Sequence, residues 1–253
     1  MFAAAAAAEL DWFALTDHDT LAGWQGVSAT QTNGVTLIRG IELSTVWSGV
    51  GIHIVGLNVD VDNPVLRAGV ALQQQARAAR AERITQVLRR AGFTLELASI
   101  EALSEGSPGR PHFAEYLVNT GQVATRNLVF RRYLGAGKAG DIKTGWAALD
   151  EVVAWIRAAG GIATLAHPSR YKLSRTKLRR LVDTFAQCGG GALEVISGRQ
   201  PNDVTAHLAQ LSHTCGLLAS CGSDFHSPEV KWAPLGMPLN LPRMCEPVWT
   251  AWQ

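Results

Sequence analysis

Short apolar runs that alternate with helical segments are the feature of this sequence that most restricts its fold. The runs have the length and composition of buried strands, and they lie at residues 11–16, 35–39, 51–57, 161–166, 192–196 and 217–221. Helical patterns separate several of them, at residues 146–159, 174–187 and 201–214. Repeated strand-helix units are typical of a largely parallel sheet or barrel. We therefore expect an α/β fold.

Residues 63–140 follow a different pattern, with a long helical stretch, shorter helices and few strand signals. Asn63 is suited to cap a helix, Pro64 to occupy its first position and Gly92 to end it. We expect this stretch to form a helical insertion. The flanking residues 1–62 and 141–253 would then form one α/β core.

The composition suits a folded, soluble protein. A chain of 253 residues is near the upper limit for one domain, and the balance of 47% hydrophobic and 17% charged residues argues against disorder. The cysteines contain no Cys-x-x-Cys pair, so we expect reduced, mostly buried thiols rather than a zinc finger.

The first residues form an alanine run that ends at Glu9 and Asp11. This run has no basic leader and is too short to cross a membrane. No other long apolar stretch occurs. We therefore expect a cytoplasmic protein without a membrane partner.

The net charge of +2 gives little information about partners. Basic residues do cluster in one helical stretch, at Arg77, Arg80, Arg83, Arg89 and Arg90. Such spacing is typical of a solvated helix face, and RNA binding is the alternative that stays open.

Several side chains that can bind metal stand at or just beyond the ends of predicted strands: His18, Glu42, His53, His167, Asp224 and His226. Loops at the carboxyl ends of strands build the active sites of barrel folds. A single histidine beside an apolar strand is more often a core residue, but the set indicates a common site. Imidazole and carboxylate ligands suit zinc, manganese or iron, and a bridging carboxylate can hold two cations about 3.5–4 Å apart.

The order of these motifs resembles the PHP (polymerase and histidinol phosphatase) family over residues 11–227. The motifs are Thr16-Asp17-His18-Asp19-Thr20, Glu42, His53, Ala166-His167-Pro168 and Ser223-Asp224-Phe225-His226. One branch of the family adds a helical insertion with an Arg-Pro-His segment, which is Arg110-Pro111-His112 here. That branch is associated with 3'-dephosphorylation of nucleoside 3',5'-bisphosphates and with 5'-to-3' exonuclease action on short RNA.

The resemblance implies a distorted seven-stranded barrel that holds up to three divalent ions. Glu42 would bridge two of them, with His53 and His167 completing one position and Asp224 joining Glu42 at the other. His18 and His226 would hold the third ion. Manganese is the metal we expect first, with zinc, iron and magnesium as alternatives.

The sequence departs from the family pattern at its beginning. The family starts with a strand that carries His-x-His and then an Asp, and nothing before Asp11 can supply them. We expect the barrel to be open at one side and the first strand to be missing through a misassigned start or a truncation. Restoring this strand should increase the rate of hydrolysis.

The resemblance and the ligand set imply hydrolysis by metal-activated water, with Glu42, His167 and Asp224 as the catalytic residues. A phosphate substrate also needs cationic groups to position it, and the loop candidates are Arg110, His112, Lys138 and Arg170. The glycine-rich loop before Lys138 does not match a P-loop, so Lys138 could equally be a solvated loop residue. The expected partner is a nucleotide or short RNA, and no DNA partner is expected.

Two other functions stay open as alternatives. The chain could be a metal-binding or nucleotide-binding module with impaired catalysis, or it could be another metallohydrolase, such as a histidinol-phosphate phosphatase or an amidohydrolase. The insertion with Arg110 and His112 favours a nucleotide over histidinol phosphate.

Overall fold

The computed structural model describes residues 1–27, 31–32, 34–104, 107–143, 145–228, 230–237 and 239–252. The chain divides into two compact units. The sheet unit comprises Met1–Val70 and Ala147–Gln253, and the helical unit comprises Ala71–Trp146.

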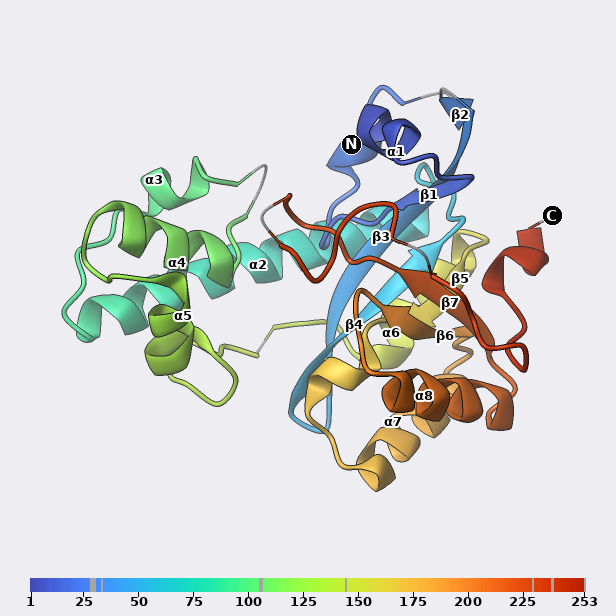
Figure 1. The fold of residues 1–253 in the computed structure, drawn as a ribbon. Helices are drawn as coiled ribbons and strands as arrows, with labels where there is room; N and C mark the ends of the chain where they lie inside the picture. The colour runs from blue at the N-terminus through green and yellow to red at the C-terminus, as the bar shows by residue number, and fades with distance from the viewer. Residues whose placement is uncertain are drawn as a thin grey trace. The chain divides into compact units, whose positions relative to one another are not determined.

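Within the described ranges, the strands all lie in the sheet unit (Figure 1). They are β1 (Trp12–Leu15), β2 (Gln31–Thr32), β3 (Val35–Trp47), β4 (Val50–Leu57), β5 (Ile162–Leu165), β6 (Ala192–Ser197) and β7 (Leu218–Gly222). They form one curled sheet with the order β1-β3-β4-β5-β6-β7, and β2 pairs with β3. The fold is therefore a mixed α/β fold.

The expectation of a largely parallel sheet is wrong for one half of this sheet. β1 pairs parallel with β3, and β5, β6 and β7 are parallel to one another, but β4 is antiparallel to both β3 and β5. The cause is local, because β3 and β4 are joined only by Ser48 and Gly49. Both residues have positive φ angles, +48° and +75°, which is the turn that closes a two-residue antiparallel hairpin.

The helices of the sheet unit bury one apolar face against the sheet. They are α1 (Phe2–Ala7), α6 (Leu149–Ala158), α7 (Arg175–Gln187) and α8 (Asn202–Thr214), together with the short 3-10 helices η1 (Ala22–Trp24), η3 (Pro168–Tyr171) and η4 (Val248–Trp252). In α7 the buried residues are Leu178, Leu181, Val182 and Phe185, which follow the spacing of one helix face. They share one core cluster with strand residues from β3 to β7.

The long helix α2 (Pro64–Arg90) begins and ends where the sequence predicts. Asn63 Oδ1 accepts hydrogen bonds from the backbone N–H groups of Val65 and Leu66 at 3.0 and 3.2 Å, so Asn63 caps the helix. Gly92 follows its end with a φ of +92°, a conformation that glycine adopts without strain. The predicted cap, first residue and stop are confirmed.

Most of α2 belongs to the helical unit, which also contains α3 (Leu97–Glu101), α4 (Arg110–Asn119), α5 (Arg126–Val129) and the π-helix η2 (Phe130–Leu134). This unit has its own core, in which Ile84 and Leu88 of α2 pack with Phe113 and Leu117 of α4. Separate cores are what make the two units compact by themselves.

The arginine cluster of α2 is not one solvated face. Arg80 is buried, and its Nε donates a hydrogen bond to the backbone oxygen of Ile142 at 2.8 Å. The guanidinium groups of Arg77 and Arg80 lie 5.9 and 5.7 Å from the ring centre of Trp146. Part of the cluster therefore packs inside the helical unit, whereas Arg83, Arg89 and Arg90 are exposed.

The cysteines and the apolar helices were also the subject of expectations from the sequence. The cysteines Cys188, Cys215, Cys221 and Cys245 are free, but they are half-buried rather than mostly buried. Among the described residues, no helix combines the length and the apolar character that a membrane span requires.

Replacing Phe185 with alanine should destabilise the sheet unit strongly. Phe185 is a fully buried residue of α7. Removing a buried aromatic ring typically costs about 3–5 kcal/mol. Urea unfolding followed by circular dichroism would measure the change in the free energy of unfolding. The control is Arg180→Ala on the exposed face of the same helix. A loss for Phe185→Ala as small as that of the control would contradict the assigned core.

Candidate metal centre

The β3–β4 hairpin places an acid and a histidine on the same face of the sheet. In its register, Glu42 lies opposite Val55 and His53 lies opposite Ser44. Because side chains alternate between faces along a strand, residues 53 and 55 project to the same side as Glu42. Glu42 Oε1 and His53 Nδ1 are 2.8 Å apart.

His167 reaches the same carboxylate from the end of β5. It precedes η3 with a φ of +29° and a ψ of +55°, a strained region for a residue other than glycine. Its Nε2 lies 3.0 Å from Glu42 Oε1 and 3.2 Å from His53 Nδ1. Its backbone N–H donates a 2.5 Å hydrogen bond to Glu194 Oε2 on β6, which holds the strained backbone in place.

The three atoms Glu42 Oε1, His53 Nδ1 and His167 Nε2 form a triangle with sides of 2.8, 3.0 and 3.2 Å. Tetrahedral ligands with bonds of about 2.0–2.1 Å lie about 3.3 Å from one another. One carboxylate and two imidazoles are also a common ligand set for a divalent transition metal. Both the spacing and the chemistry of this triangle therefore fit a divalent cation.

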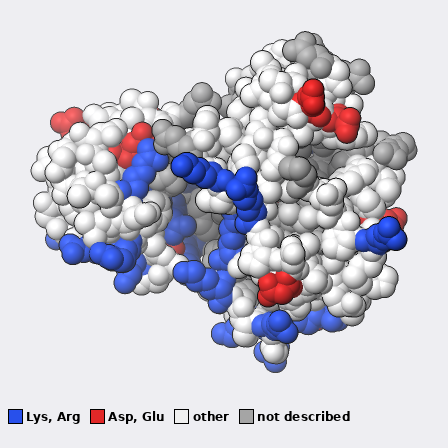
Figure 2. Space-filling model, viewed as in Figure 1, with Lys and Arg blue, Asp and Glu red and all other residues white. Residues whose placement is uncertain are grey.

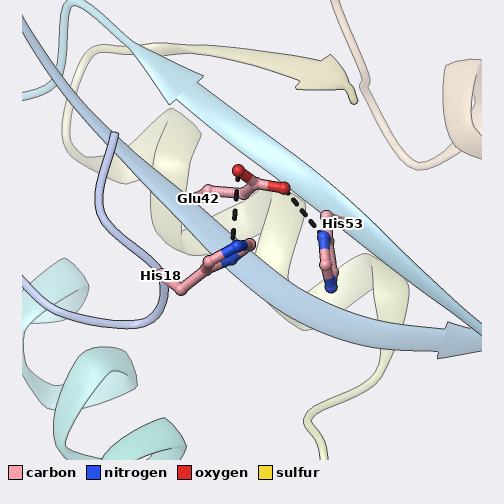
Figure 3. Close-up of side chains that lie close together, drawn as sticks. All are labelled: His18, Glu42 and His53. Carbon is pink, nitrogen blue, oxygen red and sulfur yellow. Dashed lines mark ion pairs between the residues drawn. The ribbon is translucent and has the colours of Figure 1, made fainter. Parts of the chain in front are cut away.

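His18 joins this group from the loop that follows β1. The backbone of residues 17–19 continues the pairing with β3, because Glu42 N donates to Asp17 O and Asp19 N donates to Glu42 O, at 3.1 and 2.8 Å. This pairing directs His18 Nδ1 to within 3.8 Å of Glu42 Oε2. Figure 3 shows the two oxygens of Glu42 facing His18 on one side and His53 on the other, and ligand atoms of these three residues all lie within 4.8 Å of one another.

Asp19 of the same motif has a structural role. Its side chain is buried, and it accepts hydrogen bonds from Ser44 N at 2.6 Å and from Ser44 Oγ at 2.8 Å. These contacts attach the loop to β3. They keep His18, the residue before Asp19, next to Glu42.

Asp224 and His226 approach from the loop after β7. Asp224 Oδ2 forms an ion pair with Arg170 Nη1, and Asp224 Oδ1 lies 3.5 Å from His226 Nδ1. His226 is exposed, and its ring centre lies 5.8 Å from that of His18. Arg170 also donates a 2.8 Å hydrogen bond to Ser197 Oγ and lies over the ring of Trp232 at 4.3 Å.

A cavity of about 450 Å³ opens onto these groups. Five of the six predicted ligands line it: His18, Glu42, His167, Asp224 and His226. Residues of the two edge strands, β1 and β7, line the same cavity. His53 is the remaining predicted ligand, and it contacts Glu42 and His167 directly.

The charges of this site are strongly coupled. Burial by itself would raise the pKa of Glu42, but the charge of His18 and the hydrogen bonds from His167 and His53 hold this pKa well below its usual value. Burial lowers the pKa of His167, but the hydrogen bond and charge of Glu42 outweigh this effect and raise it. Glu42 is thus an anion at neutral pH, as a cation ligand must be.

Glu194 is a site residue that the sequence reasoning missed. It lines the cavity, and burial raises its pKa to about 7. The sequence does contain a sign of this role, because Glu194 is the one acid inside the apolar run 192–196. A carboxylate is rarely placed in a buried strand without a partner. Tyr171 was also missed, and its hydroxyl donates to Ala166 O at 2.6 Å and accepts from His53 N at 3.1 Å.

The four predicted substrate residues lie in both units. Arg170 is beside Asp224 in the sheet unit, and the others are in the helical unit. There, Arg110 Nη1 donates to Leu134 O at 3.1 Å and pairs with Asp141 at 2.9 Å. His112 Nδ1 accepts from Gly109 N at 3.0 Å and so caps α4, and Lys138 is exposed.

Comparison with known proteins gives relatives over almost the whole chain, although no family model matches it. A 5'-3' exoribonuclease of Haemophilus influenzae is 40% identical over 237 residues, which are 93% of this chain and 86% of the relative. A 3',5'-nucleoside bisphosphate phosphatase of Chromobacterium violaceum is 38% identical over 246 residues, with 93% of this chain and 84% of the relative covered.

Two solved structures are similar to this chain in fold. A Chromobacterium violaceum protein, solved as an amidohydrolase with bound sulfate and no metal, has a TM-score of 0.89 and 37% identity, covering 98% of this chain and 87% of its own. A protein of Bifidobacterium adolescentis, assigned as a metal-dependent phosphoesterase, has a TM-score of 0.76 and 28% identity. The match covers 99% of this chain and 87% of that protein. With relatives of this identity and coverage, the chain belongs to the PHP family of metal-dependent phosphoesterases, in the branch of the bisphosphate phosphatase and 5'-3' exoribonuclease that it matches.

Proposed function

We propose that this chain hydrolyses the 3'-phosphate of nucleoside 3',5'-bisphosphates and digests short RNA from its 5' end. The observation that carries the proposal is the triangle of Glu42, His53 and His167 ligand atoms, with sides of 2.8, 3.0 and 3.2 Å, beside a cavity. The names of the relatives, a bisphosphate phosphatase and 5'-3' exoribonucleases, supply the substrate class.

The triangle would hold one divalent ion, with manganese expected first and zinc, iron or magnesium as alternatives. Asp224 and Glu42 would share a second ion, and His18 and His226 would contribute to a third. When bound, such ions lower the pKa of water and neutralise phosphate charge. Glu42, His167 and Asp224 are the residues that we propose as catalytic.

Around the ions, the residues of this chain would orient the phosphate. Arg170 is held by Asp224, Ser197 and Trp232, so its planar guanidinium is ordered before a substrate arrives, which lowers the entropy that binding costs. Arg110, His112 and Lys138 would add cationic groups.

We also propose that residues 63–140 act as a substrate lid on a PHP-type barrel formed by residues 1–62 and 141–253. The compact helical unit Ala71–Trp146 supports this division, as does the curled sheet of the other unit. The barrel would be distorted and seven-stranded.

An amidohydrolase activity is the second candidate, because one solved relative carries that name. The four curated relatives are instead a phosphatase and exoribonucleases. A panel with a nucleoside 3',5'-bisphosphate, histidinol phosphate and simple amides decides between the activities. Turnover of an amide without release of phosphate would overturn the proposed function.

Replacing Glu42 with glutamine should remove the bound ion and almost all activity. The amide keeps the shape of the side chain but loses the negative charge that a cation requires. We expect phosphate release from a bisphosphate nucleotide to fall by about a thousandfold, or about 4 kcal/mol in the barrier. Metal analysis and phosphate release would be measured together, with Asp62→Asn, an exposed carboxylate paired with Arg67, as the control. Full activity in Glu42→Gln would exclude this centre.

The 253-residue chain should bind about one divalent ion tightly. Three protein ligands with an open position are the minimum for a catalytic zinc site, and the triangle provides three. Asp224 has one oxygen engaged by Arg170, so the second position should be weak. Equilibrium dialysis with manganese followed by metal analysis would count the ions. Two or more tightly held ions per chain would contradict this ligand assignment.

Replacing Arg110 with alanine should raise the KM for a bisphosphate nucleotide and leave the metal content unchanged. The guanidinium is the group that we expect to contact a phosphate. Because Arg110 also pairs with the largely buried Asp141, the melting temperature is measured in parallel. Arg126→Ala, which removes the exposed pair with Glu115, is the control. An unchanged KM would remove Arg110 from the substrate site.

A further inference from the structure

The two units of the chain carry net charges of opposite sign. The sheet unit contains 12 Lys and Arg against 15 Asp and Glu, for a net charge of −3. The helical unit contains 11 against 6, for a net charge of +5 in a much shorter stretch. The chain's net charge of +2 is the sum of these opposite values.

Within the helical unit, exposed arginines occupy the last turns of two helices. Arg89 and Arg90 lie in the last turn of α2, and Arg131 and Arg132 lie in η2. The segments meet through Phe93 and Tyr133, whose ring centres are 5.0 Å apart. We call Arg89, Arg90, Arg131 and Arg132 the arginine patch.

One arginine of the patch has a partner in the protein, because Arg89 Nη2 donates a 2.6 Å hydrogen bond to the backbone oxygen of Leu95. All four side chains are exposed, and none of them forms an ion pair with a carboxylate among the described residues. The exposed acids nearest in the sequence are Glu82 on α2 and Glu96, which follows Leu95 just before α3. Figure 2 shows Lys and Arg gathered along the lower margin of the helical unit, where Figure 1 has α5, and few Asp or Glu there.

A cluster of exposed arginines that form no ion pair among the described residues suits a phosphate backbone. Guanidinium groups are weakly hydrated and form paired hydrogen bonds with phosphate oxygens. Half-buried aromatic residues follow the arginines in the sequence, at Phe93 and Tyr133, and their rings pack edge-on against each other. Basic side chains interleaved with aromatic rings are typical of single-stranded nucleic-acid binding.

We infer that the arginine patch binds RNA through its backbone phosphates. This inference rests on the proposed function, and it adds a second contact that only RNA can use. A nucleoside bisphosphate has no such backbone. The patch therefore favours oligonucleotides over mononucleotides.

The test is the affinity for RNA, measured without hydrolysis. The metal-loaded full chain is titrated into a fluorescent 12-nucleotide RNA with phosphorothioate linkages, which resist hydrolysis, at several salt concentrations. The variant Arg131→Glu with Arg132→Glu should raise the Kd about tenfold. It should also reduce the slope of log affinity against log salt by about 1.4, because each phosphate contact on a single strand contributes about 0.7.

The matched control is Arg175→Glu with Arg180→Glu, which makes the same change of charge at exposed positions of α7 in the sheet unit. It should leave the Kd for RNA near the value of the unaltered chain. Arg131→Gln with Arg132→Gln is a milder second variant, in case charge reversal impairs folding. It should weaken binding in the same direction.

Hydrolysis of a nucleoside 3',5'-bisphosphate is measured on the same proteins and should be unchanged in the patch variants. An unaltered Kd in both patch variants, or an equal loss in the control, overturns the inference. If the unaltered chain fails to hydrolyse the bisphosphate while the patch variants still lose RNA affinity, the proposed function fails and the patch stands as an RNA-binding surface.

Discussion

The two-residue turn at Ser48 and Gly49 is the constraint on which the site depends. It forces β3 and β4 into antiparallel register and so sets Glu42 and His53 on one face, 2.8 Å apart at their ligand atoms. A slip of one residue would move one of them to the opposite face. The other groups, His167 after β5 and His18 after β1, converge on the carboxylate that this hairpin presents.

The same carboxylate organises the electrostatics of the sheet unit. Glu42 is buried, yet the histidines around it keep its pKa low. An anion in a buried position is unfavourable unless it is paired, so Glu42 and its histidines stabilise one another and bind a cation with the same atoms. Glu194 extends this arrangement, because its carboxylate secures the backbone of His167 from a neighbouring strand.

Much of the site could be predicted because its residues stand at strand ends, where chain topology brings distant segments together. The antiparallel half of the sheet was missed because it depends on one turn, in which a serine adopts a positive φ that its residue type does not favour. Glu194 was missed because periodicity identifies a buried strand without showing which side chain faces a cavity. Arg89 and Arg90 of the arginine patch stand in a basic cluster that the sequence shows, with RNA binding as an open alternative, but only the fold places Arg131 and Arg132 in the same compact unit.

The strained backbone of His167 has a consequence for metal affinity. Its left-handed conformation and the hydrogen bond to Glu194 hold the imidazole close to Glu42 and His53 before any ion arrives. Ordering of the ligands is then part of folding and is not a cost of binding. Preorganised ligands of this kind also resist rearrangement, so the centre should discriminate between cations by size and preferred geometry more sharply than a flexible set of the same residues.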